Sequence, residues 1–199
     1  MEKRKRQPNV TRAKILEVAG EDFVRCGYVA SGLGGIVERA GLTKGALFHH
    51  FEDKRALGLA WLGESAATEM RATWVDPLSK LASLDELKAL SQDRLKSMSA
   101  SDALAGLVLM AAEMGGVDEA IAAAVEEVFE TWRNGFADVF RRGKEAGWIR
   151  CSIRPDVEAS FLVSMFCGFS LGMRLQSADA TRGAALMALD AYLESLREV

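Results

Sequence analysis

The stretch that decides the fold is Gly41-Leu-Thr-Lys-Gly-Ala-Leu-Phe-His-His-Phe51, which is followed by Asp53-Lys54. Thr43 is a suitable N-cap, so the stretch predicts a very short helix that ends near His49 or His50. Leu47 and Phe51 are four residues apart and share one face, which can pack against earlier helices. The exterior then consists of Thr43, Lys44, Gly45, Phe48 and His49.

Two further helices are predicted before this stretch. The first runs from about residue 9 or 10 to Arg25, because its apolar residues recur at spacings of three and four, and Gly27 is a natural stop. Ser31 is the expected cap of the second helix, which ends at Gly41. Three helices within about fifty residues, with a tight glycine-containing turn between the last two, form a helix-turn-helix pattern.

Two exterior residues of the short helix are unfavourable there unless an external surface compensates them. Lys44 puts a cation at a helix start, where the macrodipole disfavours it. Gly45 lowers helix stability by about 1 kcal/mol relative to alanine. A nearby phosphate would offset the cost at Lys44, and close approach of the backbone to a groove wall would offset the cost at Gly45. The alternative is that the stretch is a capped surface helix with two solvated histidines. A metal site at His49 and His50 is disfavoured, because neighbouring helical side chains point about 100° apart.

The motif resembles the DNA-binding domain of the TetR/AcrR transcriptional regulators, whose typical pattern is AG(V/L)(S/T)KGxLYxHFxxK. The match covers residues 9–57 with the expected spacing. Phe48 replaces the usual tyrosine, and Gly34 and Gly35 replace an arginine and an acidic residue, so operator specificity is not carried over. The resemblance implies contacts with phosphates and base edges of the major groove by Thr43, Lys44, Gly45, Phe48, His49 and His50, and a phosphate held by Lys54.

Charge is segregated along the chain. The 199 residues carry a net charge of −3, yet residues 1–55 hold 11 Lys and Arg against 7 Asp and Glu, and the remainder holds 14 against 21. This asymmetry indicates a basic N-terminal module that meets phosphate and an acidic remainder that does not. The basic run from Lys3 to Arg6 is either an arm that follows DNA or a solvated terminus.

Beyond residue 55 the helices become long, and no alternating strand pattern occurs. Helices are expected at about 53–74, 83–98, 101–115, 118–146, 155–176 and 179–197. The sequence therefore predicts an all-α fold of about nine helices. An N-terminal three-helix helix-turn-helix DNA-binding domain takes residues 1–55, and a C-terminal helical bundle for ligand binding and dimerisation takes residues 56–199.

The last two helices are the expected dimer interface. Small residues along one ridge let another helix approach closely, and leucines at spacings of three and four form a packing seam. The resemblance implies a symmetric four-helix dimer; the alternative is that both seams serve the subunit's own core. The candidate interface residues are Ser160, Ser164, Gly168, Gly172, Leu186, Leu189, Leu193 and Leu196.

Large apolar residues elsewhere in the body are candidates for the lining of an effector cavity. Each has plain core packing as its alternative. Glu113 is the only charge between Ala103 and Gly116, so it either anchors a ligand or caps a neighbouring helix. The candidate ligand-binding residues are Trp74, Met98, Met110, Glu113, Met114, Phe129, Trp132, Phe136, Phe166 and Phe169.

These observations favour a homodimeric DNA-binding regulator, most simply a repressor that binds a palindromic operator and is released by a small hydrophobic or amphipathic effector. The alternative is a regulator whose body binds a protein partner and senses no ligand. No enzyme motif, cofactor or metal site is predicted. The three cysteines lack ligand-like spacing, and the longest uncharged apolar stretch has 15 residues, Ala159 to Met173, so a cytoplasmic protein without a membrane span is expected.

Overall fold

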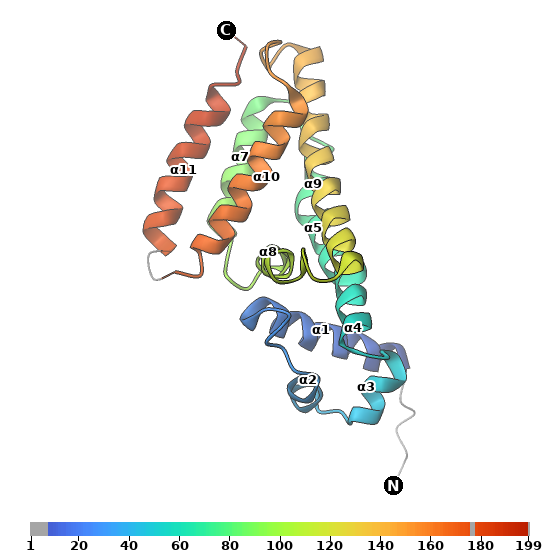
Figure 1. Ribbon diagram of the computed structural model, residues 1–199. Helices are drawn as coiled ribbons and strands as arrows, with labels where there is room; N and C mark the ends of the chain where they lie inside the picture. The colour runs from blue at the N-terminus through green and yellow to red at the C-terminus, as the bar shows by residue number, and fades with distance from the viewer. Residues whose placement is uncertain (1–7, 176–177, 199) are drawn as a thin grey trace.

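The computed structural model describes residues 8–175 and 178–198 and is helical throughout this part of the chain (Figure 1). If the contiguous segments of residues 54–78 are counted as one helix, the described residues form nine helices. They include no strand, only an isolated antiparallel bridge between Ile149 and Arg197. The predicted all-α fold is confirmed. The basic run from Lys3 to Arg6 lies outside the described residues.

The helices occur in the following order. They are α1 (Pro8–Cys26), α2 (Leu33–Arg39), α3 (Lys44–His50), α4 (Lys54–Ala60), η1 (Trp61–Ala66), α5 (Ala67–Met70), η2 (Arg71–Val75), α6 (Asp76–Leu78), α7 (Leu84–Ser97), α8 (Ala103–Met114), α9 (Glu119–Ala146), α10 (Pro155–Gly172) and α11 (Ala178–Glu194). The segments η1 and η2 are π-helical, and they interrupt a single rod that runs from Lys54 to Leu78, which we call the long helix.

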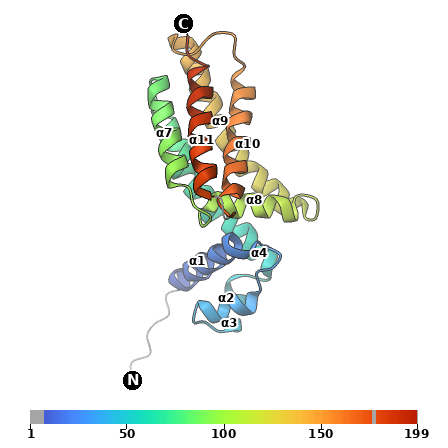
Figure 2. The same ribbon diagram turned by 90° about the vertical axis from the view of Figure 1, so that its left-hand side faces the viewer.

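Helices α1 to α3 form a small unit at one end of the molecule, and α7 to α11 form the body at the other (Figures 1 and 2). The long helix begins in the small unit and enters the body, while α8 lies crosswise between the two (Figure 1). Helix α9 runs the length of the body and packs extensively against α10. Among the described residues, no helix is both long enough and apolar enough to cross a bilayer.

Trp61 joins the small unit to the body. A Cβ added at Gly20 of α1 would lie 2.4 Å from the Trp61 indole nitrogen, and one added at Gly106 of α8 would lie 2.8 Å from the same ring. Glycines at both places therefore allow α1 and α8 to close on the indole from two sides. This packing fixes how the small unit is oriented against the body.

Helix ends largely follow the predicted signals. The Asp118 carboxylate accepts hydrogen bonds from the backbone N–H groups of the first turn of α9, and Gly147 ends that helix with φ of +75°. Ser31 does not follow them, because its hydroxyl donates to the Gly27 carbonyl over 2.6 Å and does not cap α2. The residue that precedes α2 is instead Gly32, which has no side chain to act as a cap.

Candidate nucleic-acid interface

The turn between α2 and α3 is built by Gly41. Its φ of +66° lies in the left-handed region. The Gly41 N–H donates to the Glu38 carbonyl over 3.0 Å, and the Leu42 N–H donates to the Val37 carbonyl over 3.0 Å. This pair of bonds is a Schellman motif, which ends α2 sharply. Only one residue then separates Leu42 from the first residue of α3, so α3 is held at a fixed angle to α2.

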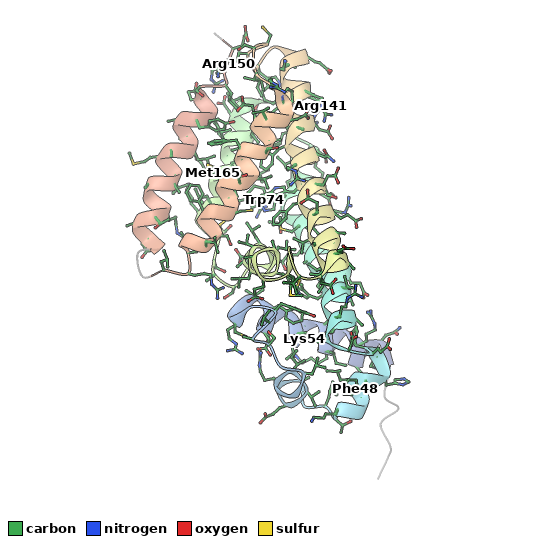
Figure 3. The ribbon with its side chains drawn as sticks, viewed as in Figure 1. Phe48, Lys54, Trp74, Arg141, Arg150 and Met165 are labelled. Atoms are coloured by element: carbon green, nitrogen blue, oxygen red, sulfur yellow. The ribbon has the colours of Figure 1, made fainter. Side chains whose placement is uncertain are left out.

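Helix α3 has one buried face and one exposed face. The Thr43 hydroxyl accepts a hydrogen bond from the Ala46 N–H over 3.2 Å, as predicted for an N-cap. Leu47 and Phe51 are buried in the core of the small unit. Phe48 is 51% exposed and projects from the end of the molecule far from Arg141 and Arg150 (Figure 3). An aromatic ring left in water on a rigid helix is a candidate contact for a partner.

Packing and ion pairing within the described residues do not account for the glycine and the lysine on the exposed face of α3. A Cβ added at Gly45 would meet nothing of the protein closer than the Thr43 hydroxyl at 4.0 Å, so internal packing does not require glycine there. Lys44 and His49 are exposed. Within the described part of the chain, Lys44 forms no ion pair, whereas Lys14 of α1 and Lys88 of α7 do. This face is free to meet an external polyanion.

His50 and Lys54 are less accessible. His50 is half-buried, and burial, followed by His49 and Arg12, lowers its pKa, so the imidazole is neutral around pH 7. The Lys54 ammonium donates to the Val29 carbonyl over 3.0 Å and lies 4.6 Å from the centre of the Tyr28 ring. Lys54 is thus bonded to the turn at Val29 within the subunit, and its contact with a phosphate stays a prediction.

The acidic residues of α1 are neutralised within the small unit. Asp22 is buried and accepts hydrogen bonds from Arg25 over 2.7 Å and from Arg39 of α2. Glu21 also pairs with Arg39. These pairs tie α1 to α2 and reduce the negative field near α3.

The predicted ligand-binding aromatics contact one another directly. The ring centres of Trp74 and Phe166 lie 4.5 Å apart, and those of Trp74 and Trp132 lie 4.9 Å apart. Phe136 joins the same cluster. Trp74 lies inside the body (Figure 3). The structure shows a packed aromatic core at these four residues.

The other predicted ligand residues are distributed through the body. Trp74 and Met98 line a pocket of about 150 Å³ between the long helix, α7 and α8. Met110 and Met114 are buried, and Phe129 and Phe169 are half-buried against the core. Glu113 is different, because its carboxylate accepts a hydrogen bond from the Val29 N–H over 2.9 Å. Of the two alternatives for Glu113, the structure favours one that is similar to helix capping. The carboxylate binds a backbone N–H group, here that of Val29 in a turn of the small unit.

Two more contacts between the small unit and the body carry no signal in the sequence. The Arg55 guanidinium of α4 donates to the Asp118 carboxylate that caps α9, over 2.5 Å and 3.2 Å. This pairing and the backbone N–H groups of α9 lower the pKa of Asp118. Arg174, just after α10, donates to the carbonyls of Val24 and Arg25 over 2.8 Å each. Both arginines find partners more than sixty residues away, which spacing alone cannot predict.

The predicted dimer residues fall into two groups. Ser160, Ser164 and Gly168 are exposed on α10, and a Cβ added at Gly168 would meet nothing within 4 Å. Gly172 instead faces α11 of the same subunit, because its added Cβ would lie 2.9 Å from the Thr181 methyl group. The leucine seam of α11 is also internal, which corrects its assignment to a dimer surface. Leu189, Leu193 and Leu196 are at most 1% exposed and Leu186 is half-buried.

A different set of residues forms the exposed apolar surface of α10 and α11, which lie side by side on one flank of the body (Figure 2). The Phe161 ring of α10 lies 4.6 Å from the ring of Tyr192 of α11. We call the surface the α10–α11 face. Its large, exposed apolar members are Val157, Phe161 and Leu171 of α10, Leu175 just after α10, and Met187 of α11.

Comparisons with known proteins agree with this geometry. Residues 15–60 match the model of bacterial regulatory proteins of the tetR family, and residues 83–189 match the tetracyclin repressor-like C-terminal domain. The chain is 25% identical over 166 residues to the HTH-type transcriptional repressor DhaR of Mycobacterium sp. (strain GP1), a match that covers 83% of each chain. It is 26% identical to the HTH-type transcriptional repressor Rv1474c of Mycobacterium tuberculosis, over 89% of each chain.

Solved structures show the same fold. A TetR transcriptional regulator from Chloroflexus aurantiacus superposes with a TM-score of 0.85 at 22% identity, covering 98% of this chain and all of the other. A putative regulator described as a TetR/AcrR family member gives 0.78 at 27% identity, over 93% and 99% of the two chains. The matched families and relatives are regulators and not enzymes, as the sequence predicted. With both its reading helix and its body matched, the chain belongs to the TetR family of transcriptional regulators.

Proposed function

We propose that the protein is a homodimeric transcriptional repressor of the cytoplasm that binds a palindromic operator through α3 and releases it when a small effector binds the body. The observation that carries the DNA-binding part is the exposed face of α3. Thr43, Lys44, Gly45, Phe48 and His49 line a surface with a free cation, an exposed ring and room for a groove wall. His50 borders this surface, and the reader is the domain of residues 1–55.

The α10–α11 face supports the dimer, which would form through the C-terminal domain of residues 56–199. Five of its large apolar residues are exposed, which is an unusual concentration for one flank of a monomer. A two-fold axis through this flank would place two copies of α3 on the same duplex. Two reading helices about 34 Å apart match successive major grooves, and a single short helix would bind too weakly for selective recognition.

Four side-chain contacts support coupling between body and reader. Glu113 of α8 holds the Val29 N–H, Lys54 of the long helix holds the carbonyl of the same residue, and Arg55 pairs with Asp118 of α9. Arg174 binds the end of α1 from the end of α10. A shift of α8, α9 or α10 caused by an effector would therefore move the small unit as one piece and change the separation of the two α3 helices.

Selection from a random duplex library tests the proposed function. We expect the enriched sequences to be two-fold symmetric, with half-site centres one helical turn or a multiple apart, and to bind two chains per site or a multiple of two. Enrichment of asymmetric sequences that bind a single chain would contradict the dimer. The absence of any enrichment would contradict DNA recognition itself.

Glu113→Ala tests the coupling. Loss of the carboxylate removes a charge-assisted bond to the Val29 N–H, so the amide hydrogen of Val29 should exchange about tenfold faster. Operator affinity should change as well, because the turn that orients the small unit is released. Both quantities are measurable by hydrogen exchange with mass spectrometry and by fluorescence anisotropy with the selected operator.

Glu86→Ala is the matched control for this change. Its carboxylate also accepts a backbone N–H, that of Ala82 over 2.7 Å, but it does so within the body. This variant should speed exchange at Ala82 and leave operator affinity and Val29 unchanged. The coupling role of Glu113 is wrong if Glu113→Ala behaves like the control at the operator.

A further inference from the structure

A groove runs between the long helix and the N-terminal half of α9. Its volume is about 320 Å³, which lies within the range of small-molecule sites. It lies next to the aromatic core but is lined by different residues from the predicted ligand set. The apolar wall includes Leu59, Ala67, Met70, Ala124 and Val128.

The long helix is shaped along this groove. Gly63 of η1, and Arg71 and Val75 of η2, line it, so both π-helical segments contribute to one wall. Short π-helical turns are rare and occur frequently at functional sites. A Cβ added at Gly63 would meet nothing within 4 Å, so the space beside this glycine is open.

One part of the lining is polar and carries both charges. Arg71 and Glu127 line the groove with Thr131. Within residues 8–175 and 178–198, neither charged side chain has an ion-pair partner, whereas Arg133, on α9 like Glu127, pairs with Glu126. The Thr131 hydroxyl donates to the Glu127 carbonyl over 2.9 Å. The groove thus combines an apolar wall with one unpaired donor group and one unpaired acceptor group.

We infer that this groove is the effector site and that it takes a neutral amphipathic molecule whose head group both accepts and donates hydrogen bonds. The inference rests on the proposed effector response. The guanidinium of Arg71 serves the acceptor of the head group and the carboxylate of Glu127 serves its donor. A head with a net charge meets a like charge from one of the two residues, whereas a carboxamide-like head satisfies both.

The position of the groove explains how binding reaches the reader. Its two walls are the long helix, which starts in the small unit at Lys54, and α9, whose cap Asp118 pairs with Arg55. A molecule seated between the walls separates the two helices close to that pair. The end of the long helix that carries the small unit then moves relative to α9.

Three probes with one apolar body test the assignment: 4-phenylbutanamide, 4-phenylbutyrate and 4-phenylbutylamine. Calorimetry on the full chain should give at least about tenfold tighter binding for the amide than for either charged probe, and Arg71→Ala should weaken the amide by about tenfold. Gly63→Leu fills the groove and should abolish binding. Leucine is the better helix former, so this variant folds.

Gly34→Leu is the matched control. It makes the same replacement at an exposed helical glycine of α2 whose added Cβ also meets nothing within 4 Å, and it should bind the amide as the wild type does. Failure of all three probes to bind, or preference for a charged head, overturns the inference. Unchanged binding of the amide by Gly63→Leu also overturns the inference. If Trp132→Phe then abolishes binding of the amide, the site is in the aromatic core. Operator binding without effector is measured separately, so a negative result here leaves the DNA-binding proposal intact.

Discussion

Lys44→Ala should lower operator affinity by about 100-fold, roughly tenfold for each charge-assisted phosphate bond lost from the two reading helices of a dimer. Lys44 is exposed at the start of α3, and the described residues offer it no internal anion. Removal of one phosphate contact per protomer should also reduce the slope of log affinity against log salt by about 2. Anisotropy titrations of the selected operator over a series of salt concentrations measure both effects.

Lys80→Ala provides the comparison for this result. Lys80 is an exposed lysine between α6 and α7 in the body, so its removal changes the net charge by the same amount away from α3. Its affinity and salt slope should match those of the wild type. Equal losses in the two variants would mean that Lys44 acts through overall charge, and no loss in Lys44→Ala would remove it from the interface.

Gly168→Trp should dissociate the dimer. The single subunit accommodates the new side chain, because a Cβ at Gly168 meets nothing within 4 Å. In a two-fold dimer the indole enters the interface twice, and overpacking of about 1–3 kcal/mol at each copy raises the dimer dissociation constant at least about 30-fold. Analytical ultracentrifugation should then show monomers or non-specific aggregates, with operator affinity reduced in parallel.

Gly116→Trp controls for the added tryptophan. Gly116 is exposed in the turn between α8 and α9, and its added Cβ also meets nothing within 4 Å. This variant should remain dimeric and bind the operator normally. If Gly168→Trp is instead a monodisperse dimer with normal operator affinity, the α10–α11 face is not the interface.

The reader could be predicted because its signals are local. The Thr43 cap, the Gly41 turn and the buried pair Leu47 and Phe51 depend on neighbours within a few residues, and each occurs as expected. The prediction that Ser31 caps α2 is wrong, because the hydroxyl of a serine that precedes a helix can bond to an earlier residue as well as to the helix that follows. Its hydroxyl bonds to the Gly27 carbonyl, and a preceding turn with left-handed Gly27 makes that carbonyl available.

The body was harder to predict because periodicity identifies a buried face and not its partner. The leucines of α11 are a packing seam as expected, but the seam packs inside the subunit, since α11 contacts α7. The outward face holds Met187 and the small residues Ala180, Gly183, Ala184, Ala188 and Ala191, which recur at helical spacing but are less hydrophobic than the leucines and so stand out less as a packing surface. In the same way, the candidate cavity residues are recognisable as large apolar side chains, but the sequence does not show that Trp74 and Phe166 pack directly against each other and that Trp74 packs against Trp132.

Long-range polar contacts and the groove were also beyond the sequence. Glu113 is an isolated charge in the sequence of its helix, yet its partner Val29 is 84 residues away. The apolar part of the groove is lined by glycine, alanine and other common apolar residues whose separate positions suggest only packing, and its two charges, Arg71 and Glu127, come from different helices. Its existence depends on how the long helix with its π-helical segments rests against α9.

The most direct test of the central claim is the binding of the purified chain to palindromic DNA from the region upstream of its own gene, measured with stoichiometry over a range of salt. The account predicts that two chains bind each palindrome, that affinity falls steeply as salt rises, and that a single half-site binds much more weakly. Binding that is independent of salt, or equal for the palindrome and a scrambled duplex, would contradict it.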